Sequence, residues 1–309
     1  DEYGEVMLSK KNKDTEVVLV GKKQEIAQKY GVLKVEEDNV LDLIEKPAEK
    51  DKASDIRLIG VYLFSKDFFK SLKETKDEHY RLEDAISVSA RGGKVKFALT
   101  DTAAPSLKYS WDLLELKNYI LSKTKGQKIA ASSRIAESAE IIGDVFIEEN
   151  TVVMEGAKIK GPCFIGRNSI VGNNAIVRNF TDIEENCTVG AYAEVKNTLI
   201  MKKTKIHSGF IGDSIIGENV RIGAQFATAN VRLDRKNVNT IVKEKKVDTS
   251  LKSLGAMIGN NVKIGIKSST MPGIIIGENS VIGPATVVRK NVAQGVRYYS
   301  KFQEVITEK

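Results

Sequence analysis

The sequence predicts two domains of different fold class, an α/β domain over residues 1–125 and a parallel β-helix over residues 126–309. Two observations lead to this prediction. In the second part, an isoleucine or valine recurs at every sixth position, which is the kind of short fixed period that solenoids show. The first part has no such repeat, and it contains both short apolar runs and amphipathic segments.

Five apolar runs in the first 125 residues predict strands, and three amphipathic segments predict helices. The predicted strands span residues 16–20, 32–36, 41–45, 56–64 and 94–99. The predicted helices span residues 66–73, 82–91 and 111–122. This mixture of strands and helices indicates an α/β domain, for which we expect a parallel sheet with exposed edges.

The six-residue repeat runs without exception from Ile129 to Val195, and Met201 follows in the same frame. A second run begins at Ile216 and ends at Val288. Six is a multiple of the two-residue strand period but not of the 3.6-residue helical period. Glycine and asparagine follow many of the aliphatic positions, and both tolerate the positive φ of a sharp turn. The pattern therefore predicts a prism of stacked coils, each of about 18 residues, with the aliphatic side chains inside.

The repeat is interrupted in two places. The frame shifts by three residues between Met201 and Ile216, and residues 228–257 form a long insertion. Long loops in compact domains are usually functional. His207 lies at the first interruption, where the earlier frame requires an aliphatic residue. Because an imidazole accepts a proton near neutral pH, His207 is a candidate general base, and a histidine without a role is the alternative.

The segment that begins at His207 (HSGFIGDS), together with the later segments IGA (222–224) and TAN (228–230), resembles the acetyltransferase half of the bifunctional sugar-1-phosphate nucleotidylyltransferase/N-acetyltransferases. The hexapeptide pattern resembles that of the left-handed β-helix acyltransferases. The resemblance implies a left-handed β-helix and a homotrimer. It also implies that His207 takes a proton from the amine of an amino-sugar 1-phosphate, such as glucosamine 1-phosphate, while that amine attacks the thioester of acetyl-CoA.

Further residues match this family at single positions. The resemblance implies that Asn230 lies at the acetyl transfer site and that the backbone of Ala224 contacts acetyl-CoA. It places Lys301, in the tail after the last coil, near the phosphates of CoA.

Arg235 and Lys236 lie where the family has basic residues against the sugar phosphate, and both cations suit a phosphate. Phe210 stands where the family often has a tyrosine, so the ring is kept but the hydroxyl that holds the sugar is absent. The preferred acceptor sugar is therefore left open.

The first domain resembles the sugar-1-phosphate nucleotidylyltransferases through the segments YGV (30–32), IEKP (44–47), IGVYLF (59–64), LEDAI (82–86) and WDLLE (111–115). The resemblance implies a Rossmann-like nucleotidyltransferase domain in which Gly31, Glu45 and Lys46 contact the sugar phosphate. The family's glycine-rich nucleotide loop is not found, so we expect the domain to be partial.

Ser106 stands where the family has an aspartate that binds Mg²⁺, and a serine is a poor ligand for this ion. We therefore expect Mg²⁺ to bind only in an intact domain, and we expect no nucleotidyl transfer by this chain.

The composition excludes several classes of protein. The chain has 48 Lys and Arg against 41 Asp and Glu, and these charges are interspersed, which argues against nucleic acid as a partner. Two cysteines and two histidines exclude a disulfide framework and a Cys/His zinc module, so no metal site is predicted. No apolar run approaches the roughly 18 residues that span a bilayer, and no signal peptide is recognisable, so we expect a cytoplasmic protein without a membrane partner.

Two alternatives remain beside acetyl transfer. One is a sugar-1-phosphate nucleotidylyltransferase whose β-helix only forms the oligomer. The other is a non-catalytic regulatory or scaffold subunit.

Overall fold

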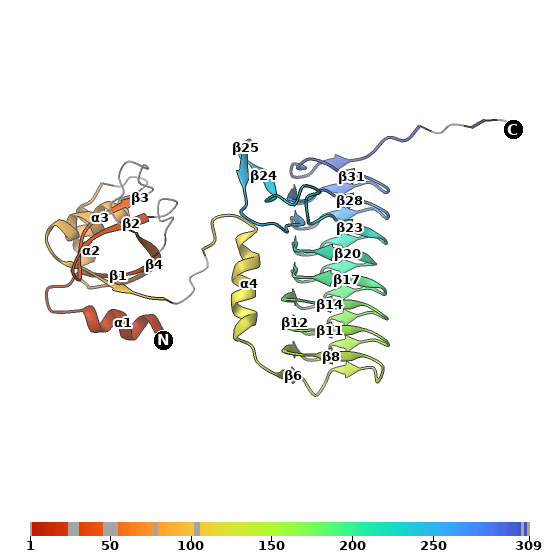
Figure 1. The fold of residues 1–309 in the computed structure, drawn as a ribbon, viewed down its shortest axis with the longest axis horizontal. Helices are drawn as coiled ribbons and strands as arrows, with labels where there is room; N and C mark the ends of the chain where they lie inside the picture. The colour runs from red at the N-terminus through yellow and green to blue at the C-terminus, as the bar shows by residue number, and fades with distance from the viewer. Residues whose placement is uncertain are drawn as a thin grey trace. The chain divides into compact units, whose positions relative to one another are not determined.

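The computed structural model describes residues 2–23, 31–45, 55–76, 80–101, 106–303 and 306–307. The chain forms two compact units, Asp1–Ala104 and Pro105–Lys309 (Figure 1). This division precedes the expected boundary at residue 125 because helix α4 (Asp112–Lys123) packs against the β-helix. Trp111 and Leu114 share a buried apolar cluster with Leu199 and Ile215 of the coils.

In the first unit the described strands form a closed five-stranded barrel. Around the barrel the order is β1 (Val17–Lys23), β4 (Ile56–Phe64), β2 (Gly31–Glu36), β3 (Asn39–Glu45) and β5 (Val95–Leu99). Among the described strands only β1 and β5 pair in parallel, so the expected parallel sheet with exposed edges is wrong. Closure gives every described strand two neighbours, although β2 pairs with β4, and β3 with β5, at one residue pair each.

Three helices accompany this barrel in the described residues: α1 (Glu2–Lys10), α2 (Phe68–Glu74) and α3 (Arg81–Arg91). Leu19, Leu33, Phe68 and Ile86 are fully buried between the barrel and helices α2 and α3. The five predicted strands and the helices at 66–73 and 82–91 are confirmed to within a few residues, whereas α1 was not predicted.

The second unit is a parallel β-helix whose described strands form three sheets. Sheet I contains β7 (Arg134–Ile135), β10 (Val152–Val153), β13 (Ile170–Val171), β16 (Thr188–Val189), β19 (Lys205–Ile206), β22 (Arg221–Ile222), β27 (Lys263–Ile264), β30 (Val281–Ile282) and β32 (Arg297–Tyr298). Sheet II contains β8 (Glu140–Ile142), β11 (Lys158–Lys160), β14 (Ile176–Arg178), β17 (Ala193–Lys196), β20 (Gly209–Gly212), β23 (Phe226–Thr228), β28 (Ser269–Thr270) and β31 (Val287–Val288). Sheet III contains β6 (Gln127–Ile129), β9 (Val145–Ile147), β12 (Cys163–Ile165), β15 (Thr181–Ile183), β18 (Leu199–Ile200), β21 (Ile215–Ile216), β26 (Ala256–Ile258) and β29 (Ile274–Ile276).

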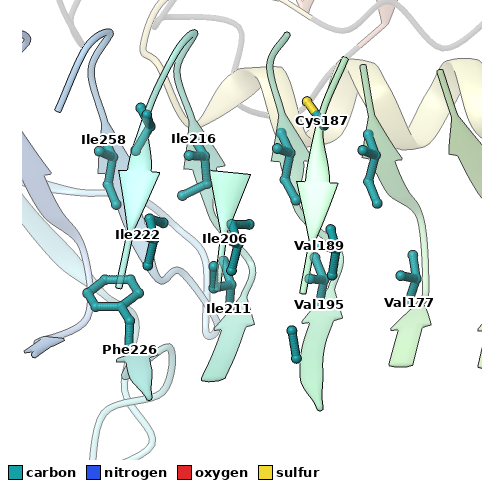
Figure 2. Close-up of a cluster of buried hydrophobic side chains, with 14 of the residues drawn as sticks. Val177, Cys187, Val189, Val195, Ile206, Ile211, Ile216, Ile222, Phe226 and Ile258 are labelled. Carbon is teal, nitrogen blue, oxygen red and sulfur yellow. The ribbon is translucent and has the colours of Figure 1, made fainter. Parts of the chain in front are cut away.

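The register confirms the predicted coil. Ile159 pairs with Ile141 in the coil before it and with Val177 in the coil after it, 18 positions away in each direction. Figure 2 shows the aliphatic side chains of successive coils stacked inside the prism. Asn150 and Asn168 adopt positive φ at the corners, as expected for residues that tolerate this region.

The three-residue frame shift is divided among three corners, each shorter by one residue. The buried positions are Val195, Ile200, Ile206, Ile211 and Ile216. Three of the four steps between them span five residues, and one spans six. Ile206 therefore fills the inward position. The expectation that His207 replaces an aliphatic residue of the ladder is wrong, and His207 is exposed.

The insertion after β23 folds back onto its own unit. It contains an antiparallel hairpin of β24 (Asn239–Val242) and β25 (Lys245–Asp248). Val238 and Leu254 of the insertion are buried in the same apolar cluster as Trp111 beside α4. No helix in the described ranges is long and apolar enough to cross a membrane.

Candidate functional site

His207 lies at the corner between sheets I and II, directly after β19. Its backbone N–H donates a hydrogen bond to the carbonyl of Ile222 in the next coil, at 2.9 Å. On the other side, a Cβ at Gly190 would lie 2.0 Å from the carbonyl oxygen of His207, so only glycine fits there. The backbone is thus fixed from both sides, while the exposed imidazole can meet a substrate.

A groove of about 610 Å³ runs along sheet I beside His207. Three exposed cations line it: Lys205 pairs with Arg221 in the β-ladder, and Arg221 pairs with Lys263. Neighbouring strands lie about 4.8 Å apart, so these side chains form a continuous column of positive charge. We call Lys205, Arg221 and Lys263 the cationic column. Sequence reasoning missed it, although each member directly precedes an inward aliphatic residue.

The cationic column suits a ligand with several phosphates, such as CoA. Ala224 lies at the same corner as His207, one coil further on, and follows Gly223, which lines the groove. The structure therefore brings Ala224 close to His207. Lys301 is exposed in the tail after β32, which leaves the last coil in Figure 1, and the structure does not bring it to this groove.

Phe210 and Asn230 lie together at the other end of sheet II. Phe210 is on β20, and Asn230 follows β23 in the next coil. A Cβ at Gly212 would lie 2.7 Å from Cζ of Phe210 and 2.9 Å from Nδ2 of Asn230. The ring and the amide therefore both lie over Gly212, which leaves no room for a side chain there.

Asp213, in the preceding coil, holds the side-chain amide of Asn230 by a hydrogen bond. Its side chain is only 4% exposed, and its backbone has a φ of +49° at the corner between sheets II and III. Oδ2 accepts hydrogen bonds from Nδ2 of Asn230 at 2.5 Å and from Nζ of Lys196 at 3.0 Å. Oδ1 accepts one from Nδ2 of Asn197 at 2.8 Å. Sequence reasoning missed this residue; the signal was an aspartate at a corner where Asn179 and Asn197 occupy the earlier coils.

Helix α4 is tied to the same corner through Lys117. Nζ of this buried lysine donates hydrogen bonds to the carbonyl of Phe180 and, at 3.1 Å, to Oδ1 of Asn197. Burial lowers the pKa of Lys117 to about 8. Burial also raises the pKa of the nearby Asp182 carboxyl to about 6.

Within one chain His207 and Asn230 are at opposite ends of the same face. Gly212 is five positions after His207, and an extended chain rises about 3.3 Å per residue, so roughly 16 Å lies between these positions. The structure does not bring the two expected catalytic residues into contact within one chain.

Arg235 and Lys236 lie in the insertion and are both exposed. Neighbouring Asp234 forms an ion pair with Arg232 at 2.6 Å and accepts a hydrogen bond from the backbone N–H of Lys236. Within the described residues, neither Arg235 nor Lys236 makes an ion pair, so both cations can reach a ligand.

In the first unit, Gly31 begins β2 and pairs with Glu45 at the end of β3, so these two expected contacts are neighbours in the barrel. Lys46 lies outside the described residues. Ser106 is exposed. No group of three or more His, Cys, Asp and Glu side chains that could hold a metal occurs in the ranges that the structure describes.

Models of known protein families match both the first and the second part of the chain. The nucleotidyl transferase family model matches residues 1–112. The model of the GMPPB C-terminal domain matches residues 159–264, and that of the bacterial transferase hexapeptide (six repeats) matches residues 255–290.

Several curated relatives cover most of the chain. Bifunctional protein GlmU of Methanococcus maripaludis is 42% identical over 287 residues, which are 91% of this chain and 69% of the relative. The bifunctional sugar-1-phosphate nucleotidylyltransferase/acetyltransferase of Sulfurisphaera tokodaii is 32% identical, over 95% of this chain and 75% of the relative. The uncharacterized acetyltransferase YaiX of Escherichia coli is 36% identical, over 67% of this chain and 94% of the relative. The expected resemblance is confirmed, and the chain belongs to the family of bifunctional sugar-1-phosphate nucleotidylyltransferase/acetyltransferases.

Proposed function

We propose that the β-helical unit transfers the acetyl group of acetyl-CoA to the amine of an amino-sugar 1-phosphate, such as glucosamine 1-phosphate. The observation that carries this proposal is the exposed His207 at the end of a groove lined by the cationic column. The column offers three cations to the phosphates of CoA, and the imidazole lies where a proton acceptor is needed.

Acetyl-CoA supplies an activated acyl group. His207 takes a proton from the amine as the nitrogen attacks, and it returns the proton to the departing thiolate. The backbone at Ala224 holds the thioester, and Asn230 positions the amine. Arg235 and Lys236 hold the sugar phosphate, and the ring of Phe210 packs against the sugar.

A homotrimer is part of this proposal. His207 and Asn230 lie at opposite ends of one face, so a site that uses both requires two chains. In the trimer, His207 of one chain faces Asn230 of its neighbour across the groove between two β-helices.

The test is a thiol-release assay with acetyl-CoA and either glucosamine 1-phosphate or galactosamine 1-phosphate. Replacing His207 with alanine should lower kcat by about 10²- to 10⁴-fold, as expected for loss of a general base. His79 is the chain's other histidine, and H79A is the matched control that should keep wild-type turnover. Full activity of H207A would exclude the proposed base. Absence of thiol release from wild-type protein with both sugars would favour the scaffold alternative.

The nucleotidyl transferase model matches residues 1–112, so the first unit belongs to a domain for nucleotidyl transfer to a sugar phosphate, an activity that we expect only when this domain is intact. Gly31, Glu45 and Lys46 are the proposed contacts to the sugar phosphate. Ser106 offers no carboxylate for Mg²⁺, so we expect this chain to release no pyrophosphate from nucleoside triphosphates. Pyrophosphate release above a control without enzyme would contradict that expectation.

A further inference from the structure

The Asp213 carboxylate has one feature that matters for the orientation of Asn230. A carboxylate only accepts hydrogen bonds, whereas an asparagine side chain has a donating Nδ2 and an accepting Oδ1. Nδ2 of Asn230 therefore faces Asp213, and Oδ1 is turned away from it. In the described part of the chain, no donor reaches Oδ1 of Asn230, so this oxygen is available to a ligand.

The carboxylate is itself held in place. Lys196 and Asn197 donate to it from the preceding coil, and Asn197 in turn accepts a hydrogen bond from Lys117 of helix α4. The chain of hydrogen bonds thus runs from α4 through Asn197 and Asp213 to Asn230. Because Asp213 is almost wholly buried, water cannot replace its partners without a change of structure.

From this geometry we infer that Asp213 is a positioning residue for acetyl transfer, which orients Asn230 so that Oδ1 accepts a hydrogen bond from the attacking amine. This inference rests on the proposed function. The nitrogen gains positive charge as its bond to the acetyl carbon forms, so a fixed acceptor for its N–H stabilises the transition state more than the bound substrate. The proton itself goes to His207.

The main test replaces Asp213 with asparagine in the full chain. The new amide keeps the size of the carboxylate but can present either an oxygen or a nitrogen to Asn230, so the orientation is no longer fixed. Loss of a hydrogen bond to a charged group corresponds to a kcat about 10- to 100-fold lower. The KM for acetyl-CoA should be unchanged, because the cationic column lies on sheet I, whereas Asp213 lies at the corner between sheets II and III.

Two further variants separate positioning from a structural role. If Asp213 acts only through Asn230, then D213N should change kcat by less than about twofold when Asn230 is already alanine. D182N is the matched control, since Asp182 is another buried carboxylate of this region, and no hydrogen bond between Asp182 and Asn230 occurs among the described residues. It should keep wild-type kcat.

A wild-type kcat for D213N, or an equal loss in the N230A background, would overturn the inference. If D213N fails to fold, N197A removes one donor to the carboxylate and should cause a smaller loss of kcat that also vanishes in the N230A background.

A measurement without turnover separates this inference from the proposed function. The side-chain amide NMR signals of Asn230, identified by their loss in N230A, should move in D213N and stay unchanged in D182N. If wild-type protein acetylates no amino-sugar phosphate, the proposed function fails, while this shift still decides whether Asp213 orients Asn230. Unmoved signals in D213N would reject the orientation itself.

Discussion

Replacement of Asp182 with asparagine should stabilise the β-helical unit relative to wild type, and this stabilisation should increase as the pH rises from 4 to 7.5. Oδ1 of Asp182 is buried, and within the described residues it has no hydrogen-bond partner. Burial, and next the charge of Glu184, raise its pKa from 3.8 to about 6, while Lys117 acts in the opposite direction.

The size of the effect follows from this pKa. Between pH 3.8 and about 6 the folded protein binds more protons at this carboxyl than the unfolded chain does, so wild-type stability falls as the pH rises through this window. Above the folded pKa the full cost is present, and the difference between the two pKa values corresponds to about 3 kcal/mol. Asparagine carries no charge, so D182N is free of this cost at every pH. The difference in free energy of unfolding between D182N and wild type should therefore increase by about 2–3 kcal/mol between pH 4 and pH 7.5.

Urea denaturation followed by circular dichroism at both pH values measures this gain, at one protein concentration because oligomers are stabilised by mass action. E185Q is the matched control. Glu185 is half-buried, and its hydrogen bond from Arg167 lowers the pKa of its carboxyl. The stability of E185Q relative to wild type should therefore fall as the pH rises. A D182N difference that stays flat or falls between pH 4 and 7.5 would refute the reasoning.

Three other outcomes are expected. G212A should lower kcat in the thiol-release assay, because its Cβ would displace Phe210 and Asn230; G92A, where a Cβ meets nothing closer than 3.4 Å, should not. R221Q should raise the KM for acetyl-CoA and leave the KM for the sugar phosphate unchanged. If the wild-type KM for acetyl-CoA did not depend on salt, binding of CoA by the cationic column would be contradicted. Sedimentation at micromolar concentration should give three times the 34.0 kDa mass of the chain, and a monomer would exclude the two-chain site.

The sequence determined the coil of the β-helix because the coil is a local property. Each hexapeptide carries its own inward aliphatic residue and its own turn residues, so the 18-residue register between Ile141 and Ile159 follows from spacing alone. The sequence also showed that His207 lies at an interruption of the repeat and that the segment around it resembles a known family. The strands of the first unit were also predicted, since each is a short apolar run.

Only the tertiary structure decided how these segments meet. Ile206 rather than residue 207 points inward because three corners are each shortened by one residue, and spacing within one run does not say which corners shorten. Helix α4 belongs to the β-helix because Lys117 reaches Phe180 and Asn197, far along the chain. The contact of Asp213 with Asn230 joins two coils, and the burial that makes such hydrogen bonds strong arises only when the coils stack.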